Sequence, residues 1–267
     1  MKTTFALLAA AAVFAPASFA ADPVEKSFAA SADGSEQLYV EIDYSGGRKG
    51  ADVLFALHGH GSDRWQFALQ ERGECAAARA AAEERGMVYV SPDYRACTSW
   101  MGPKAESDLV DLAERYRAER GAKHVFFCGA SMGACSTIAF ALLHPDLVDG
   151  FVAMNGMCDF VAYGNFQDAI AESFGGDKKT AMAEYVKRSA IYSPDAIRVP
   201  CAFTFGMKDD IVAPFSGIAL AERIKALHPE LCHIDIDAGR GHETAYEPAL
   251  KAFRAMFESF DAAHPAK

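Results

Sequence analysis

Three kinds of polar residue, found from the middle of the chain onward, have the types and order of a nucleophile, an acid and a base. Ser131 stands in the pentapeptide Gly-Ala-Ser-Met-Gly, and His242 follows a glycine further along the chain. Between them lies the aspartate pair Asp209 and Asp210. A serine hydroxyl is a weak nucleophile at neutral pH, so it needs an imidazole to accept its proton and a carboxylate to orient that imidazole. These residue types therefore predict acyl transfer through a covalent serine intermediate.

The pentapeptide around Ser131 lies between an apolar run, residues 124–127, and a helical run, residues 134–143. A strand, a G-x-S-x-G turn and a helix are the setting of a nucleophile elbow. The turn is so tight that the residues two before and two after the serine must be small, and here they are Gly129 and Gly133. The following helix start offers unpaired N–H groups to a developing oxyanion. An ordinary glycine-rich turn is the alternative.

Elsewhere the sequence alternates apolar, strand-like runs with helical segments. Besides a hairpin over residues 27–44, the runs predicted as strands are 51–57, 87–92, 124–127, 150–156, 200–206 and 232–237. The segments predicted as helices are 66–86, 104–120, 134–143, 216–227 and 248–260. This alternation favours an α/β fold with a mostly parallel sheet. Asp209 and His242 follow the strands at 200–206 and 232–237, so they should meet Ser131 at one sheet edge.

Four motifs resemble the α/β-hydrolase superfamily, a three-layer sandwich with helices on both faces of the central sheet. They are His58-Gly59-His60-Gly61, Gly129 to Gly133, Gly206 to Val212, and Gly241-His242. The similarity spans roughly residues 50 to 260. It is greatest to the dienelactone-hydrolase, prolyl-oligopeptidase-like and secreted feruloyl or acetyl-xylan esterase groups.

The resemblance also implies roles for individual residues. In those groups the acid stands three residues after a strand-end glycine, which selects Asp209 over Asp210. Their His-Gly-x-Gly run supplies one oxyanion donor, so the backbone N–H groups of His60 and Met132 become the expected pair. The nucleophile is serine here, whereas dienelactone hydrolases proper use cysteine. We expect no β-propeller before the domain, unlike prolyl oligopeptidases, which counts against a peptidase.

The resemblance therefore implies hydrolysis of carboxylic esters of small molecules or acylated carbohydrates, without a cofactor. A serine peptidase of the prolyl-oligopeptidase-like type and an inactive hydrolase-fold binding module remain alternatives. We expect the loop 95–100 and a helical insertion, residues 157–198, to wall the cleft. Trp100 would then either stack on a sugar or an aromatic acyl group or pack as a loop tryptophan.

A metal site is a weaker interpretation of the stretch around His58, His60 and Asp63. Two imidazoles in an H-x-H pattern are suitable zinc ligands, but a third ligand is not evident in the sequence. The oxyanion-loop interpretation already accounts for these residues. We therefore expect no metal.

The first 20 residues have the pattern of a signal peptide. Lys2 precedes an apolar run over residues 5–14, and the small residues Ser18 and Ala20 suit cleavage after Ala20. We therefore expect residues 21–267 to form a single α/β-hydrolase domain, secreted or periplasmic.

The net charge of −10 argues against nucleic acid and anionic membrane surfaces as partners. The chain has seven cysteines and no C-x-x-C pair, so a redox or zinc motif is not indicated. In an oxidising compartment some of them are expected to pair, with a bridge among Cys97, Cys135 and Cys158 as one option. The sequence leaves the pairing, the oligomeric state and the acyl and alcohol specificity open.

Overall fold

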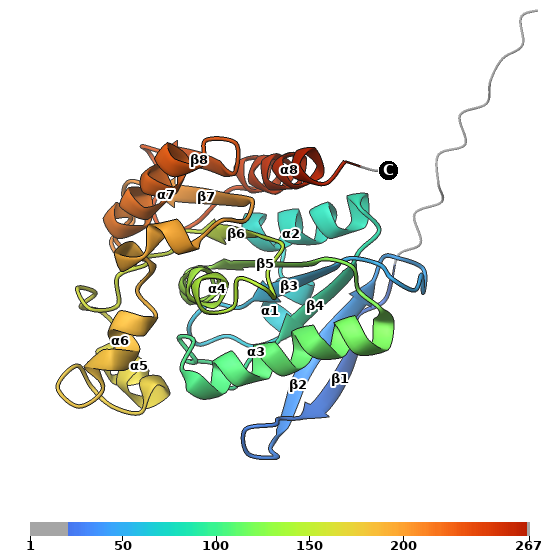
Figure 1. Ribbon diagram of the computed structural model, residues 1–267, viewed down its shortest axis with the longest axis horizontal. Helices are drawn as coiled ribbons and strands as arrows, with labels where there is room; N and C mark the ends of the chain where they lie inside the picture. Colours follow the sequence, from blue (N-terminus) through green and yellow to red (C-terminus); the bar gives the residue numbers. More distant parts are fainter. Residues whose placement is uncertain (1–20, 266–267) are drawn as a thin grey trace, which may run out of the picture.

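An eight-stranded sheet forms the centre of the protein. The structure, a computed structural model, describes residues 21–265, so the predicted signal peptide lies outside the described residues (Figure 1). The strands follow the order β1-β2-β4-β3-β5-β6-β7-β8. Their bounds are β1 Val24–Ala29, β2 Glu36–Asp43, β3 Val53–Leu57, β4 Val88–Pro92, β5 Val125–Ala130, β6 Gly150–Met154, β7 Cys201–Gly206 and β8 Cys232–Asp237.

The sheet is mostly parallel, as the alternation of strands and helices predicted. Only the pairings of β1 with β2 and of β2 with β4 are antiparallel, and the other five are parallel. The β1–β2 hairpin turns at Gly34, which has a φ of +72°. Parallel strands place their carboxyl ends at one edge, and this edge receives the loops that follow β3, β5, β7 and β8.

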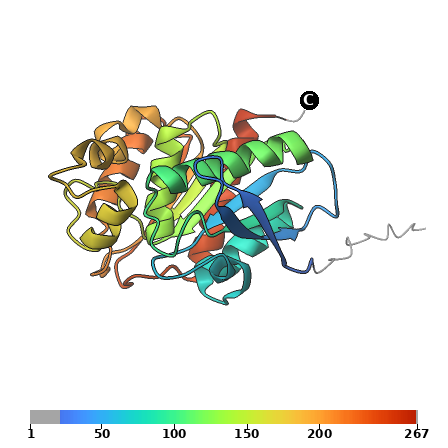
Figure 2. The ribbon, with the colours of Figure 1, turned by 90° about the horizontal axis from the view of Figure 1, so that it is seen from below.

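Helices cover both faces of the sheet (Figures 1 and 2). One face packs against α3, α4 and α7, and the other packs against α1, α2 and α8. The helices are α1 Trp65–Leu69, α2 Gly73–Glu84, α3 Pro103–Arg115, α4 Met132–Leu143, α7 Phe215–Leu227 and α8 Tyr246–Ala263. Strand side chains alternate between the two layers: Phe55 and Phe127 belong to the first, and their neighbours Leu54 and Phe126 belong to the second.

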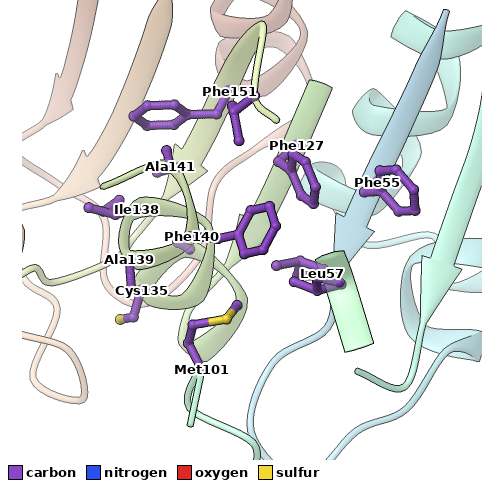
Figure 3. Packing of buried hydrophobic residues seen from close by; sticks show 14 of the residues in the cluster. Phe55, Leu57, Met101, Phe127, Cys135, Ile138, Ala139, Phe140, Ala141 and Phe151 are labelled. Carbon is purple, nitrogen blue, oxygen red and sulfur yellow. The ribbon is translucent and has the colours of Figure 1, made fainter. Parts of the chain in front are cut away.

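Helix α4 is buried on all sides, which accounts for its largely apolar sequence. Figure 3 shows Phe140 of α4 pointing at Phe127 of β5, and their ring centroids lie 4.8 Å apart. Phe127 in turn stacks on Phe55 of β3 at 5.0 Å. This packing fixes the N-terminal end of α4, where Ser131 precedes the first helical residue.

The predicted helix over residues 66–86 is wrong in one respect, because it is two helices, α1 and α2. The chain is extended at Gln70, and the guanidinium group of Arg79 donates to the carbonyl oxygens of Phe67 and Gln70. A long-range cap therefore ends the first helix. Gly73 then begins the second against other backbone, since a Cβ there would lie 2.5 Å from the amide nitrogen of Tyr246.

Residues 157–198 contain helices α5 (Gln167–Phe174) and α6 (Met182–Lys187) and two short 3-10 turns, Ala190–Tyr192 and Pro194–Ala196. Within residues 21–265, no helix is long and apolar enough to cross a membrane. All seven cysteines are free thiols, so no bridge forms among Cys97, Cys135 and Cys158.

Candidate active site

Ser131 occupies a strained turn between β5 and α4. Its backbone has a φ of 58° and a ψ of −124°, a conformation that L-residues rarely adopt. A Cβ at Gly133 would lie 2.0 Å from the carbonyl oxygen of Leu57, and one at Gly129 would lie 2.3 Å from the carbonyl carbon of Gly133. The turn therefore excludes side chains at both glycines, as the sequence predicted.

His242 joins Ser131 to Asp209. The Nε2 atom of His242 lies 2.8 Å from the Ser131 hydroxyl, and its Nδ1 atom lies 2.7 Å from Oδ2 of Asp209. The His242 side chain is 17% exposed and that of Asp209 only 1%. With Nδ1–H donating to the carboxylate, Nε2 has its lone pair toward the hydroxyl, which is the tautomer that accepts a serine proton.

The structure brings Asp209, and not Asp210, to the histidine. The second carboxylate oxygen of Asp209 accepts hydrogen bonds from the backbone N–H groups of Ile211 (3.0 Å) and Val212 (2.9 Å). These bonds fix the carboxylate plane with Oδ2 toward His242. Asp210 is exposed, and it is Asp209 that His242 contacts.

Two other aspartates before the histidine loop, Asp235 and Asp237, are engaged elsewhere. Asp235 pairs with Lys251, and Asp237 accepts from Gly239 and Arg240.

The loops that carry the acid and the base are bonded to each other. The backbone N–H of Lys208 donates to the carbonyl of Arg240 at 2.8 Å, and that of Met207 donates to Asp237 at 2.9 Å. Gly206 permits this approach, because a Cβ there would lie 2.1 Å from the carbonyl oxygen of Gly241. The relative position of the two side chains is thus set by backbone contacts.

A buried polar chain that the sequence reasoning missed supports the histidine loop. The hydroxyl groups of Thr204 and Thr244 lie 2.7 Å apart, and Thr244 donates to Oδ1 of Asn155 at 3.4 Å. The amide of Asn155 donates to the carbonyl of Gly241, next to the histidine, at 3.5 Å. Thr204 and Asn155 are polar residues near the ends of apolar strands, and Thr244 lies two residues after His242. These positions are visible in the sequence.

Cys135, a thiol near Ser131, stays protonated at neutral pH. Cys135, one turn into α4, is fully buried, and its Sγ accepts a hydrogen bond from the N–H of Met157 at 3.3 Å. Burial raises the pKa of the Cys135 thiol to about 12. Because the thiolate is the nucleophilic form, Cys135 does not compete with Ser131 at neutral pH.

The predicted oxyanion donors lie on two segments that meet at Ser131. Met132 is the first residue of α4, where an N–H has no partner within the helix. His60 lies in the loop after β3, and a Cβ on its neighbour Gly59 would lie 3.7 Å from Cβ of Ser131. Gly59 donates its N–H to the side-chain oxygen of Gln66 at 2.7 Å, which anchors this loop to α1.

Of the two roles expected for Trp100, the structure shows the packed loop tryptophan and not the substrate-stacking residue, because the side chain is fully buried. Its indole packs against the rings of Phe160, Tyr163 and Phe166. Its Nε1–H donates to Nδ1 of His60 at 3.0 Å. No face of the ring is open to a substrate. Trp100 instead supports the loop of His60 through this hydrogen bond.

The residues considered for a metal site are bonded in other ways. Both ring nitrogens of His58 face backbone carbonyl oxygens, those of Gly59 at 2.9 Å and Asp93 at 3.1 Å. Burial lowers the pKa of His58. In the part of the chain that the structure describes, no group of three or more His, Cys, Asp or Glu side chains is arranged to hold a metal ion.

A cavity of about 260 Å³ lies beside the acid loop, between the insertion and the start of α7. Its lining residues are Met157, Asp159, Ala162, Tyr163, Gly164, Asn165, Ala213, Phe215 and Ser216. The hydroxyl of Tyr163 and the amide of Asn165 both donate to the carbonyl of Ile211, two residues after the acid. The insertion therefore contacts the acid loop directly, through two residues that also line the cavity.

Solved structures with a similar fold include both peptidases and esterases. The acylaminoacyl peptidase of Pyrococcus horikoshii has a TM-score of 0.67 at 16% identity, over 91% of this chain and 42% of that chain. Est1E from Butyrivibrio proteoclasticus has a TM-score of 0.67 at 13% identity, over 88% of this chain and 99% of that chain. An esterase of Pyrococcus furiosus, Pf2001, has a TM-score of 0.61 at 14% identity, over 91% of this chain and 93% of that chain.

The chain therefore spans about two fifths of the length of the peptidase and nearly all of the two esterases. At these identities the likeness establishes the fold, which is that of the α/β-hydrolases. A search of curated proteins finds no match. The profile of the Prolyl oligopeptidase family matches residues 76–261, more than half of the chain. The chain has the α/β-hydrolase fold, and it belongs to that family.

Proposed function

We propose that the protein hydrolyses carboxylic esters through an acyl-enzyme on Ser131. The observation that carries the proposal is the continuous hydrogen-bonded line from Asp209 through His242 to the Ser131 hydroxyl, with spacings of 2.7 and 2.8 Å. A binding module on an inactive scaffold has no need of all three residues in this alignment. We assign Ser131 as nucleophile, His242 as general base and acid, and Asp209 as the carboxylate that orients the imidazole.

The reaction follows from this geometry. Ser131 attacks the ester carbonyl while Nε2 of His242 takes its proton, and the N–H groups of His60 and Met132 stabilise the oxyanion. The imidazolium, paired with Asp209, returns the proton to the departing alkoxide. A water activated by His242 then attacks the acyl-enzyme and releases the acid. No cofactor is required.

The cavity beside the acid loop is the proposed site for the non-reacting part of the substrate. Met157, Tyr163 and Phe215 give it apolar walls, and the Phe215 side chain is 68% exposed at its rim. A cavity of about 260 Å³ suits a short acyl chain or a single ring. We propose small-molecule or carbohydrate esters as substrates, because both contain groups of this size.

A peptidase activity on substrates with a free amine is the second candidate, and Asp159 favours it. This carboxylate lines the same cavity, and only its Oδ1 atom is engaged, by the N–H of Ala162 and the hydroxyl of Tyr192. Its Oδ2 atom has no hydrogen-bond partner among residues 21–265. Lys178 interacts electrostatically with Asp159 and offsets part of its charge.

Two measurements test the ester proposal. A fluorophosphonate probe should label the wild type at Ser131, and a nitrophenyl ester series of increasing chain length should be hydrolysed. Ser131→Ala should abolish labelling and lower turnover by several powers of ten, up to about a millionfold, with an unchanged circular dichroism spectrum. Turnover close to wild type in folded Ser131→Ala protein would refute the assignment.

A matched substrate pair separates the peptidase candidate. Leucine nitroanilide has a free amine, and N-acetyl-leucine nitroanilide does not. If Asp159 binds the amine, Asp159→Asn should raise KM about tenfold for the first compound and leave the second unchanged. Asp195→Asn, an exposed aspartate on a nearby turn, is the control. Failure of the wild type to cleave either nitroanilide would rule out this candidate.

We also propose that the protein is exported, because of the signal-peptide pattern in residues 1–20. Expression of the full chain in a bacterial host should give a mature protein that begins at Ala21. Retention of Lys2 in the purified protein, found by mass spectrometry, would contradict this.

A further inference from the structure

The loop over residues 94–101 has an unusual backbone. Four of its residues other than glycine have positive φ angles: Tyr94 at 34°, Arg95 at 91°, Trp100 at 44° and Met101 at 61°. Such conformations are costly and persist where the surrounding structure imposes them, which happens often at functional sites. The loop lies against the oxyanion loop after β3.

Three hydrogen bonds join the two loops. The hydroxyl of Tyr94 donates to the carbonyl of His58 at 2.7 Å, and the N–H of Gly61 donates to the carbonyl of Cys97 at 2.7 Å. The third is the bond from Nε1 of Trp100 to Nδ1 of His60, at 3.0 Å. These contacts lie on both sides of His60 and fix its ring. The strained loop therefore determines the conformation of this residue.

The bond from Trp100 determines where the proton of His60 sits. An indole N–H can only donate, so Nδ1 of His60 must be the acceptor and must lack a proton. The neutral imidazole therefore has its proton on Nε2. Burial lowers the pKa of His60, which favours this neutral form near pH 7.

The Nε2–H group of His60 is left available. It has no hydrogen-bond partner among residues 21–265, and it is not among the side-chain polar atoms that are both buried and unpaired. One side of the ring packs against Phe166, with the ring centroids 4.5 Å apart. The site thus contains a fixed donor on the residue whose backbone N–H is the proposed oxyanion donor.

We propose that the imidazole of His60 is a specificity-determining group that donates from Nε2–H to a second oxygen of the substrate, close to the scissile carbonyl. Trp100 is its positioning residue. The inference rests on the proposed ester hydrolysis and names the substrate class: esters with an ether or hydroxyl oxygen near the reacting carbon, as in alkoxy or hydroxy acids and sugar esters. A purely alkyl ester offers no acceptor to this donor.

The test compares esters in which one CH₂ group is replaced by oxygen. Nitrophenyl methoxyacetate and nitrophenyl butyrate differ in this way in the acyl half. 2-Methoxyethyl acetate and butyl acetate differ in this way in the alcohol half. For each pair the measured quantity is the ratio of the two kcat/KM values. Intrinsic reactivity cancels when this ratio is compared between a variant and the wild type.

Two substitutions of His60 separate its two nitrogens. His60→Asn keeps an acceptor near the position of Nδ1, so the bond from Trp100 is retained, and it removes the Nε2 donor. His60→Gln can place an N–H near the position of Nε2. In at least one pair, His60→Asn should lower the preference for the oxygen-containing ester by about tenfold, the effect of one lost hydrogen bond. His60→Gln should restore it to within about threefold.

A spectroscopic measurement tests the tautomer independently of activity. Long-range ¹H–¹⁵N correlation of the imidazole at pH 7 should show His60 as Nε2–H in the wild type, and Trp100→Phe should weaken this preference. An Nδ1–H tautomer in the wild type would overturn the proposal. So would unchanged preference ratios for both ester pairs in His60→Asn. A wild type that neither hydrolyses esters nor reacts with fluorophosphonate would overturn the proposed function as well, which distinguishes the two failures.

Discussion

Replacing Asp209 by asparagine should inactivate the enzyme almost without changing its shape. In the wild type, Oδ1 of Asp209 accepts from the N–H groups of Ile211 and Val212, and Oδ2 faces Nδ1 of His242 at 2.7 Å. An asparagine must keep its oxygen toward the two N–H groups. Its NH₂ group therefore faces His242 and donates to Nδ1. The proton of the imidazole then moves to Nε2, which faces the Ser131 hydroxyl and can no longer accept its proton.

The size of the loss can be estimated from these contacts. Turning the asparagine over to restore the productive tautomer would break its two backbone hydrogen bonds, at roughly 1 to 1.5 kcal/mol each. The charge-assisted bond that stabilises the imidazolium is lost as well, which adds about 1.5 to 3 kcal/mol. Together these come to about 5 kcal/mol, or close to ten-thousandfold in kcat.

Asp210→Asn is the matched control, because Asp210 is adjacent and exposed. A solvated carboxylate outside the triad exerts only a screened field, so this variant should lose less than about tenfold. The assay is turnover of a nitrophenyl ester by both purified variants, with circular dichroism and thermal unfolding as folding controls. If Asp210→Asn is the inactive variant, or if Asp209→Asn keeps a tenth of wild-type turnover, the assignment of the acid is wrong.

Three further predictions follow from the fold. Gly133→Ala places a Cβ 2.0 Å from the Leu57 carbonyl oxygen, so it should destabilise the protein by about 3 kcal/mol or more, measured by denaturant unfolding. Gly164→Ala is the control, because a Cβ there meets open space, and it should change stability by less than about 0.5 kcal/mol. Burial raises the pKa of Asp108 to about 6 from about 3.9 when unfolded, so its protonated form stabilises the fold below pH 4 and this contribution is lost as the pH rises through 6. The unfolding free energy of Asp108→Asn should therefore improve relative to wild type between pH 4 and 7, and a constant difference would contradict this. A thiol reagent should modify only the exposed Cys97 in the native protein and all seven cysteines after denaturation, and an unreactive native protein would contradict the placement of Cys97.

The parts of the site that the sequence predicted are those set by local geometry. The elbow is one: Gly129, Ser131 and Gly133 are close in sequence, and their constraint is a single tight turn. The meeting of Asp209 with His242 is another, because both follow strands of a parallel sheet whose carboxyl ends share an edge. For such residues the order of elements along the chain is enough.

The parts that escaped prediction depend on contacts between distant segments. Trp100 lies in a polar loop, yet it is fully buried because the insertion packs Phe160 and Phe166 against it. The helix break at Gln70 depends on Arg79, whose guanidinium group returns to cap the first helix. Burial and capping of this kind are tertiary, so periodicity along the sequence does not contain them.

Three glycines connect these two cases. Gly133 lies against the backbone of Leu57, Gly206 against that of Gly241, and Gly73 against that of Tyr246. Each removes a side chain where backbone from another segment must pass. Two of the three lie within motifs that carry the triad, because the triad requires separate loops to approach more closely than side chains allow. The motifs are thus informative about function for a physical reason: they mark the backbone contacts that bring serine, acid and histidine together. Trp100 and Asp159, for which we propose roles in substrate selection, lie outside them.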